Sequence, residues 1–277
     1  TFALDVDTGS YSVARRYLRD GYLPDKDSVR VEEFVNYFAQ DYSIPTIEEG
    51  LSLSIDGGTT PFVQNPRNQV VRVGVQAGQI DPNQRSDANL VFVIDTSGSM
   101  AREDRLGLVK RSLELLVGSL RPTDTIAIVE YGSTARQVLP PTPVGEEGTI
   151  LGAIDSLQPN GSTNAAQGLE LGYQLANQAF EPGGINRVIL CSDGVANVGA
   201  ATDAEGILNL IASDAERGIN LVTVGFGMGN YNDVLMEQLA DQGDGFYSYV
   251  DTLDEARRIF VDGLSGTLET VAGEAKI

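Results

Sequence analysis

The stretch Leu90-Val-Phe-Val-Ile-Asp-Thr-Ser-Gly-Ser99 decides the fold, because an unbroken apolar run leads directly into a turn rich in oxygen side chains. A run without polar alternation is typical of a parallel strand that is covered on both faces. A second run of this kind, Val188-Ile-Leu-Cys-Ser192, also ends at an aspartate, Asp193. The two runs predict neighbouring strands whose carboxyl ends carry acidic side chains.

Helix and strand patterns alternate around these two runs. Five leucine or valine residues between Leu106 and Leu120 recur at spacings of 3, 4, 3 and 4, which predicts an amphipathic helix. Further strands are expected at 125–131, 221–225 and 245–250, a hairpin partner at 134–139, and helices at 149–157, 165–179, 204–215, 231–240 and 253–260. Such alternation predicts an α/β fold, a Rossmann-like doubly wound and mostly parallel sheet with helices on both faces.

The first 86 residues have a weaker pattern. Helices are expected at 11–19 and 31–38, and period-two alternation predicts half-buried strands at 51–55 and 70–75. The polar, turn-rich stretch 80–87 indicates a linker. We therefore expect an amino-terminal helix-and-strand region at 1–86, an α/β domain at 87–265, and a tail at 266–277 that leads into further sequence. Any signal segment would lie outside the sequence given.

Composition excludes several classes of site. The 277 residues contain one cysteine and no histidine, so an intramolecular disulfide, Cys/His zinc sites and histidine-based catalytic triads are excluded. The formal net charge is −20, which opposes binding to nucleic acid. No apolar run is long enough to predict a transmembrane segment.

Three oxygen-rich segments are expected at the carboxyl ends of the strands, where open α/β sheets bind ligands. They are Asp95-Thr-Ser-Gly-Ser99, Asn160-Gly-Ser-Thr-Asn164 and Ser192-Asp-Gly194. Together they offer carboxylates and hydroxyls without nitrogen or sulfur ligands, a set that suits Mg²⁺, Mn²⁺ or Ca²⁺. The structural alternative is that these serine, threonine and aspartate side chains cap helices and bind no metal.

The motif Asp95-x-Ser97-x-Ser99, together with Thr163 and Asp193, resembles the metal-ion-dependent adhesion site of von Willebrand factor type A domains. The resemblance implies that these five residues are direct or water-mediated metal ligands and that one coordination position accepts an acidic side chain from a partner. The segments 2–11 and 31–38 resemble the region that precedes this domain in bacterial YfbK-like proteins. That likeness implies a location in the cell envelope or outside the cell.

The expected function is a divalent-metal-dependent, adhesion-type protein-binding module rather than an enzyme. The alternative is a metal-dependent hydrolase at the same edge of the sheet, with a metal-bound water as nucleophile. Because most of the −20 charge lies in the α/β domain, a partner that offers one Asp or Glu carboxylate is expected to be basic elsewhere.

A rival motif lies near the amino terminus. Asp7-Thr-Gly-Ser10 matches the active-site motif of aspartic proteases, in which two aspartates share a proton. However, the counterpart at Asp95 has one residue too many, and the chain after Asp7 has a helical pattern. The simpler interpretation is that Asp5 and Asp7 cap the following helix and pair with Arg15, Arg16 or Arg19.

Overall fold

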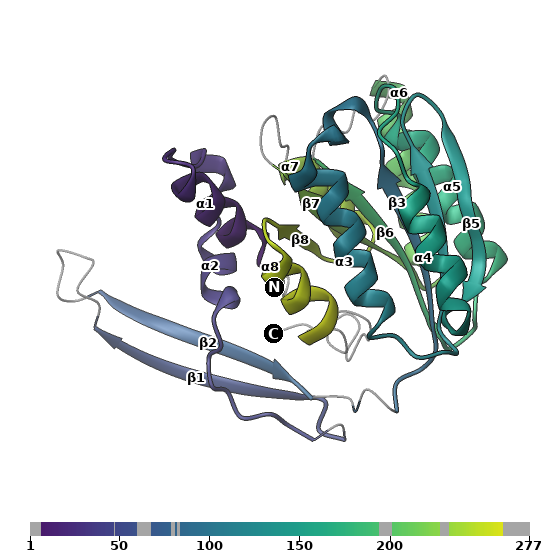
Figure 1. Ribbon diagram of the computed structural model, residues 1–277. Helices are drawn as coiled ribbons and strands as arrows, with labels where there is room; N and C mark the ends of the chain where they lie inside the picture. The colour runs from purple at the N-terminus through teal and green to yellow at the C-terminus, as the bar shows by residue number, and fades with distance from the viewer. Residues whose placement is uncertain are drawn as a thin grey trace.

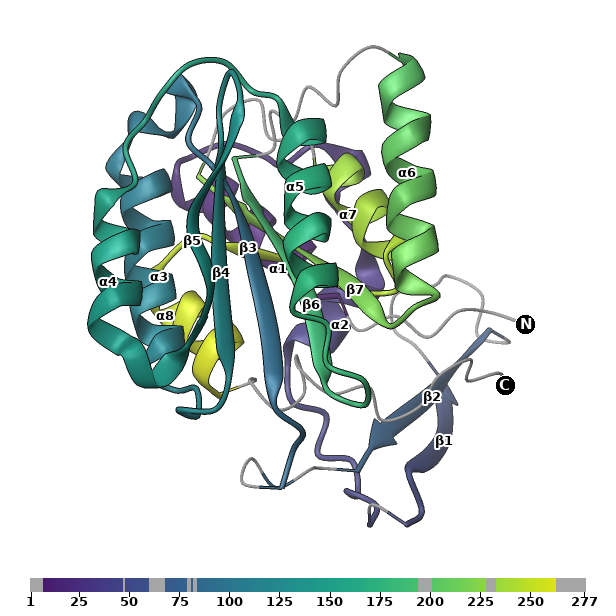
Figure 2. The same cartoon turned by 90° about the vertical axis from the view of Figure 1, so that its right-hand side faces the viewer.

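The computed structural model describes residues 7–46, 48–59, 68–78, 81, 84–193, 201–227 and 233–262. These residues form a six-stranded sheet between two layers of helices, and a separate two-stranded hairpin that lies to one side (Figures 1 and 2). The candidate tail at 266–277 and Asp5 lie outside the described residues.

The large sheet confirms the predicted fold class. Its strand order is β5-β4-β3-β6-β7-β8. Every neighbouring pair is parallel except β4 and β5, which form the expected antiparallel hairpin. The strands are β3 (Ala88–Asp95), β4 (Thr125–Tyr131), β5 (Ala135–Pro143), β6 (Ile185–Ser192), β7 (Ile219–Phe226) and β8 (Tyr247–Val250).

Helices cover both faces of this sheet (Figure 2). One layer contains α3 (Leu108–Val117), α4 (Glu147–Ser156) and α8 (Leu253–Arg257), with short 3-10 or π turns at Val144–Glu146 and Arg258–Asp262. The other layer contains α5 (Ala165–Gln178), α6 (Ala201–Ala215) and α7 (Asp233–Gln242). All eight residues of β3 are buried, because Leu90, Phe92 and Ile94 pack toward the first layer while Val91 and Val93 pack toward the second.

The helix expected between Leu106 and Leu120 is confirmed as α3 but begins at Leu108, after two short turns. A 3-10 turn, Gly98–Ala101, is followed by a π-helical turn, Glu103–Gly107, and only then by α3. The wider π turn adds one residue to the hydrogen-bonded ring and so alters the direction of the side chains along it. Its Arg105 is buried, although the sequence pattern placed the first buried residue at Leu106.

The amino-terminal region contains the predicted elements but buries them differently. They are α1 (Gly9–Arg19), a 3-10 turn at Lys26–Ser28, α2 (Val31–Tyr37), β1 (Leu51–Thr59) and β2 (Gln69–Ala77). The strands are antiparallel, with Leu53 opposite Val75 and Ile55 opposite Val73. The expectation that they are half-buried is wrong, because Leu53 and Ile55 are 54% and 65% exposed.

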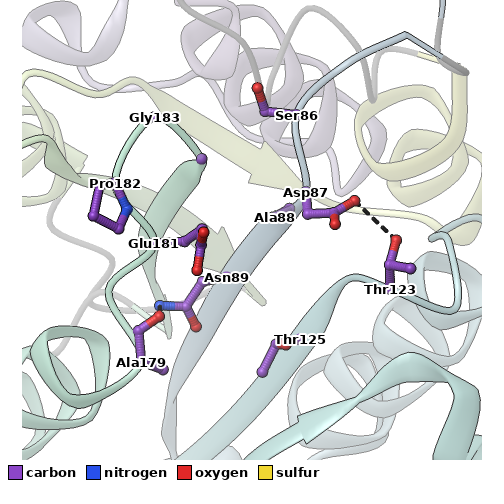
Figure 3. Close-up of a pocket in the computed structure, with 11 residues that line it drawn as sticks. Ser86, Asp87, Ala88, Asn89, Thr123, Thr125, Ala179, Glu181, Pro182 and Gly183 are labelled. Carbon is purple, nitrogen blue, oxygen red and sulfur yellow. Dashed lines mark hydrogen bonds between the residues drawn. The ribbon is translucent and has the colours of Figure 1, made fainter.

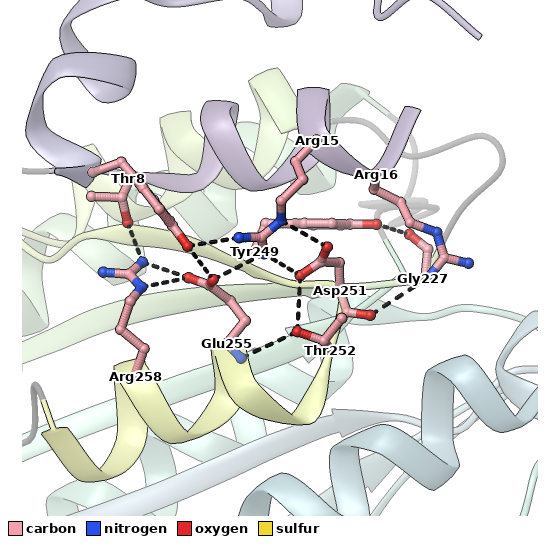
Figure 4. A network of polar contacts seen from close by, with 10 residues as sticks. Thr8, Arg15, Arg16, Gly227, Tyr249, Asp251, Thr252, Glu255 and Arg258 are labelled. Atoms are coloured by element: carbon pink, nitrogen blue, oxygen red, sulfur yellow. Dashed lines mark hydrogen bonds and ion pairs between the residues drawn. The ribbon is translucent and has the colours of Figure 1, made fainter. Parts of the chain in front are cut away.

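The α1 helix is fixed to the end of the large sheet by charged and hydroxyl groups (Figure 4). The Arg15 guanidinium pairs with Asp251 at 2.5 Å and with Glu255 at 3.0 Å, and the Tyr37 hydroxyl donates to Glu255 at 2.8 Å. An Asp7 carboxylate oxygen accepts the backbone N–H of Tyr247 at 2.8 Å. Asp7 therefore joins the start of the described chain to β8, whereas residue 8 occupies the N-cap position of α1.

The expected linker at 80–87 contains a buried ion pair. The Arg85 guanidinium donates to both carboxylate oxygens of Asp124, at 2.9 Å for Nη1, and both side chains are buried. The end of this stretch is therefore fixed to the start of β4. Among the described residues, no helix is long and apolar enough to cross a membrane.

Candidate metal centre

Asp95 is the last residue of β3 and its side chain is 0% exposed. One carboxylate oxygen accepts the backbone N–H of Ser97 at 2.8 Å, and the other accepts the hydroxyl of Ser192 at 3.0 Å. Burial raises the pKa of Asp95, and the nearby charge of Asp193 raises it further, although hydrogen bonds from Ser97 and Ser192 act against the rise. A buried carboxylate with a raised pKa is a group that gains from a nearby cation.

Ser97 and Ser99 lie on the turn that follows Asp95, and their hydroxyl oxygens are 3.0 Å apart. The fully buried Met100 anchors this turn, and its backbone N–H donates to the Ser97 carbonyl at 2.9 Å. Ser97 occupies the N-cap position of the 3-10 turn but its side chain caps no backbone N–H. The helix-capping alternative therefore does not describe the Ser97 hydroxyl.

The loop that carries Thr163 is joined to the Asp95 turn through the backbone. The N–H of Gly98 donates to the Gly161 carbonyl at 3.0 Å, and the N–H of Asn160 donates to the Thr96 carbonyl. Close packing requires glycine at 132, because a Cβ there would lie 2.1 Å from the Asn160 carbonyl oxygen. These contacts place the Thr163 loop against the first oxygen-rich segment.

The Thr163 side chain is partly buried, and within the described residues it forms no hydrogen bond with Asp95, Ser97, Ser99 or Asp193. It does not cap α5 either, since the side chain of Asn164 occupies that position and accepts the N–H of Gln167 at 3.3 Å. The Thr163 hydroxyl thus has no capping role, and only the backbone of its loop is seen in contact with the Asp95 turn.

Asp193 follows β6 directly and is buried. Its Oδ2 accepts Nη1 of Arg105 at 2.5 Å, and the same nitrogen donates to the Ser99 carbonyl at 2.8 Å. Arg105 was not predicted from the sequence. It precedes the amphipathic helix pattern, so periodicity gave no signal that its side chain turns inward.

These residues fit a hard divalent cation by their chemistry. Two buried carboxylates are accompanied by the hydroxyls of Ser97 and Ser99, all of them oxygen ligands. The guanidinium of Arg105 pairs with Asp193, whereas no Lys or Arg of the described residues pairs with Asp95. No three acidic, histidine or cysteine side chains of the described chain gather as a metal cluster, so hydroxyls and water would complete the coordination.

A cleft lies at the opposite edge of the sheet, at the amino ends of the strands (Figure 3). Two of its polar side chains are bonded to neighbouring protein groups. Asp87 accepts the Thr123 hydroxyl at 2.8 Å, and the Asn89 amide donates to the Ala179 carbonyl at 3.0 Å. Ligands of open α/β sheets bind at the carboxyl ends of the strands, so this cleft is the less favoured candidate.

Comparison with protein families agrees with the observed architecture. The profile described as von Willebrand factor type A domain matches residues 89–261, and one described as von Willebrand factor matches residues 1–72. The uncharacterized protein YfbK of Escherichia coli is 43% identical over the whole chain, which spans about half (49%) of that relative's length.

Two solved structures share the fold. A von Willebrand factor type A protein from Catenulispora acidiphila has a TM-score of 0.58 at 17% identity, covering 83% of this chain and 51% of that one. The manganese-loaded TRAP protein of Plasmodium vivax has a TM-score of 0.51 at 23% identity, covering 64% of this chain and 74% of that one. At these identities the likeness concerns the fold alone.

Proposed function

The chain belongs to the von Willebrand factor type A domain family, and from this premise we propose that it captures a protein partner through one bound divalent cation. The observation that carries the proposal is the buried Asp95 carboxylate at the carboxyl edge of the sheet, next to Asp193 and the hydroxyl pair. The TRAP protein of Plasmodium vivax, which shares the fold, was solved loaded with manganese, and this is consistent with a metal in the present chain.

Five residues would hold the ion, directly or through water: Asp95, Ser97, Ser99, Thr163 and Asp193. Mg²⁺ is the favoured ion, with Mn²⁺ or Ca²⁺ as substitutes, because all the donors are oxygens. When bound, the ion supplies an open coordination position that attracts an Asp or Glu carboxylate of a partner. The two strand ends keep the aspartates in place, since β3 and β6 are paired up to Ile94 and Cys191.

We favour binding over hydrolysis because both aspartates of the proposed site already have protein partners among the described residues. Both oxygens of Asp95 accept hydrogen bonds from Ser97 and Ser192, and Asp193 is paired with Arg105. The chain also contains no histidine that could act as a general base. We therefore propose that the site holds a partner and does not turn over a substrate.

The partner is proposed to be basic around one exposed carboxylate, and to meet this chain in the cell envelope or outside the cell. A net charge of −20 attracts a basic protein over long range, whereas the ion acts only at contact. Added salt should then slow association while Mg²⁺ is saturating. An association rate that rises with ionic strength would point to an acidic partner instead.

Thermal unfolding of metal-free protein tests the proposed site. Mg²⁺ or Mn²⁺ at a hundredfold excess over its dissociation constant stabilises a one-site protein by about 2.7 kcal/mol, which raises the melting temperature by several degrees. We expect this rise in the wild type and not in Asp95→Asn or Asp193→Asn. The matched control Asp155→Asn removes an exposed carboxylate from α4 and should keep the rise. Equal shifts in all four proteins would reject the assignment.

A further inference from the structure

Arg105 is a cation already present at the proposed metal centre. Its Nη1 lies 2.5 Å from Oδ2 of Asp193 and 2.8 Å from the carbonyl oxygen of Ser99. The Asp193 side chain is 0% exposed and that of Arg105 only 9%. The guanidinium therefore contacts two of the segments that are proposed to surround the ion.

The Arg105 side chain occupies space that is left open by the glycine at position 227. Gly227, which follows β7, has a positive φ of 77°, and a Cβ at this position would lie 2.4 Å from Cγ of Arg105. The Gly227 carbonyl in turn accepts the hydroxyl of the buried Tyr249 (Figure 4). Glycine at 227 thus leaves room for the arginine stem, and β8 holds that glycine in place.

A divalent cation would balance the two carboxylate charges of the proposed metal centre more fully than the single charge of the guanidinium does. Asp95 and Asp193 are both buried, the guanidinium pairs with Asp193, and no Lys or Arg of the described residues pairs with Asp95. A single positive charge balances one carboxylate, whereas a 2+ ion balances both. An uncompensated buried carboxylate is costly, so Asp193 needs a positive neighbour when the metal is absent.

We propose that Arg105 is a resident counter-ion of Asp193, which a divalent cation must displace before Asp193 can serve the metal. This inference rests on the proposed metal-binding function and adds a residue that sets the metal concentration at which the site fills. The guanidinium stabilises the metal-free protein and competes with the ion. Removing it should make metal binding tighter and the metal-free protein less stable.

The opposite signs of these two effects separate a counter-ion from a residue that merely supports the fold. A supporting residue, once removed, would loosen the site and weaken metal binding together with stability. In Arg105→Gln we expect at least tenfold tighter binding and a lower melting temperature in EDTA. Arg105→Lys keeps the charge but loses the planar fork, so a smaller rise in affinity is expected.

The test is a Mn²⁺ titration of the metal-free 277-residue chain in which electron paramagnetic resonance measures the free ion. The proteins are the wild type, Arg105→Gln, Arg105→Lys, Asp95→Asn and the control Arg111→Gln, which removes an exposed arginine from α3. Circular dichroism establishes that each variant is folded. If Arg105→Gln does not fold, the comparison of Arg105→Lys with the wild type decides.

The outcomes distinguish the two proposals. Tighter binding in the Arg105 variants, with Arg111→Gln within twofold of the wild type, supports the counter-ion. Site-dependent binding in the wild type that is unchanged or weaker in the Arg105 variants overturns the counter-ion and leaves the metal centre standing. No binding in any protein, or equal binding in wild type and Asp95→Asn, overturns the metal centre and the counter-ion with it.

Discussion

The two sheets of the molecule carry similar apolar residues but bury them to opposite extents. Every residue of β3 is buried between two layers of helices. In the hairpin, Leu53, Ile55 and Val73 lie on one face of β1 and β2 and are largely exposed, and among the described residues no helix layer covers this face. An apolar pattern therefore identifies a strand, whereas burial depends on segments that are distant in the sequence.

The same contrast holds for the amino-terminal helices. In α2, Val31 and Val35 are exposed while Glu33 is buried. Glu33 accepts the backbone N–H of Ser10 at 2.7 Å and pairs with Arg30. Charged groups thus form buried contacts within the amino-terminal region, and Val13 of α1 packs into the apolar core that holds the type A domain. The predictions below ask whether this difference governs stability.

The largest effect is expected from the buried ion pair that joins residue 85 to the type A domain. Asp124 accepts hydrogen bonds from Arg85 and from the backbone N–H groups of Ala88 and Arg121. Asp124→Ala leaves a buried guanidinium and two N–H groups without this partner and should lower the free energy of unfolding by about 3–5 kcal/mol. Urea unfolding of the whole chain measures the loss.

The matched control for Asp124→Ala is the exposed pair of the hairpin, Asp56 with Arg72. Asp56→Ala should leave the unfolding midpoint almost unchanged, because exposed ion pairs are screened by water and salt. Similar losses in the two variants would contradict the contrast between the regions.

Acid should remove the contribution of Asp124. Burial alone would raise its pKa, but hydrogen bonds from Arg85, Ala88 and Arg121 and the charge of Arg85 lower it. A carboxylate whose folded pKa lies below its unfolded value, about 3.9, stabilises the native state above that value. The stability difference between wild type and Asp124→Asn should be constant from about pH 7 to 5 and shrink as the pH falls through the folded pKa. If the stability difference between the two proteins instead grew as the pH fell, the pKa of Asp124 would not be lowered by folding.

A single isoleucine in each sheet sharpens the comparison. Ile128 in β4 is 0% exposed, so Ile128→Ala should cost about 2–5 kcal/mol through lost contacts and a cavity. Ile55 in β1 is mostly exposed, and Ile55→Ala should change the free energy of unfolding by no more than about 0.5 kcal/mol. Chemical unfolding measures both. A large loss in Ile55→Ala would mean that the apolar face of the hairpin is covered in solution.

The smallest effect is expected where α1 meets the sheet. Arg15→Gln removes ion pairs with Asp251 and Glu255, and should weaken the docking of α1 by about 1–2 kcal/mol. Amide hydrogen exchange should then accelerate roughly 5–30-fold in α1 and remain unchanged in β3. Arg19→Gln, at an exposed position of the same helix, is the control. Equal acceleration in α1 and β3 would show that the two regions unfold together.

Sequence predicted the type A domain well because its local and long-range signals agree. The runs that end at Asp95 and Asp193 are continuous and apolar, and such runs are stable only between two covering layers. The parallel pairing of β3 and β6 then brings the two aspartates to the same edge. The roles of the five proposed ligands remain a prediction.

The features that sequence did not reveal depend on contacts between distant segments. Arg105 turns inward because of a π-helical turn and a glycine more than a hundred residues later, and neither changes the local periodicity. Arg85 lies in a polar stretch whose burial is decided by Asp124. The alternation in β1 and β2 predicted the strands correctly, but it contains no information about what covers them.

The measurement that tests the metal centre most directly is isothermal titration calorimetry of the metal-free 277-residue chain with Mg²⁺ or Mn²⁺, compared with Asp95→Asn and Asp155→Asn. We expect one ion to bind per wild-type chain and per Asp155→Asn chain, and none to bind at this affinity to Asp95→Asn, because the buried Asp95 carboxylate is the central ligand. Equal binding to the wild type and Asp95→Asn, or no binding to either, would contradict the account.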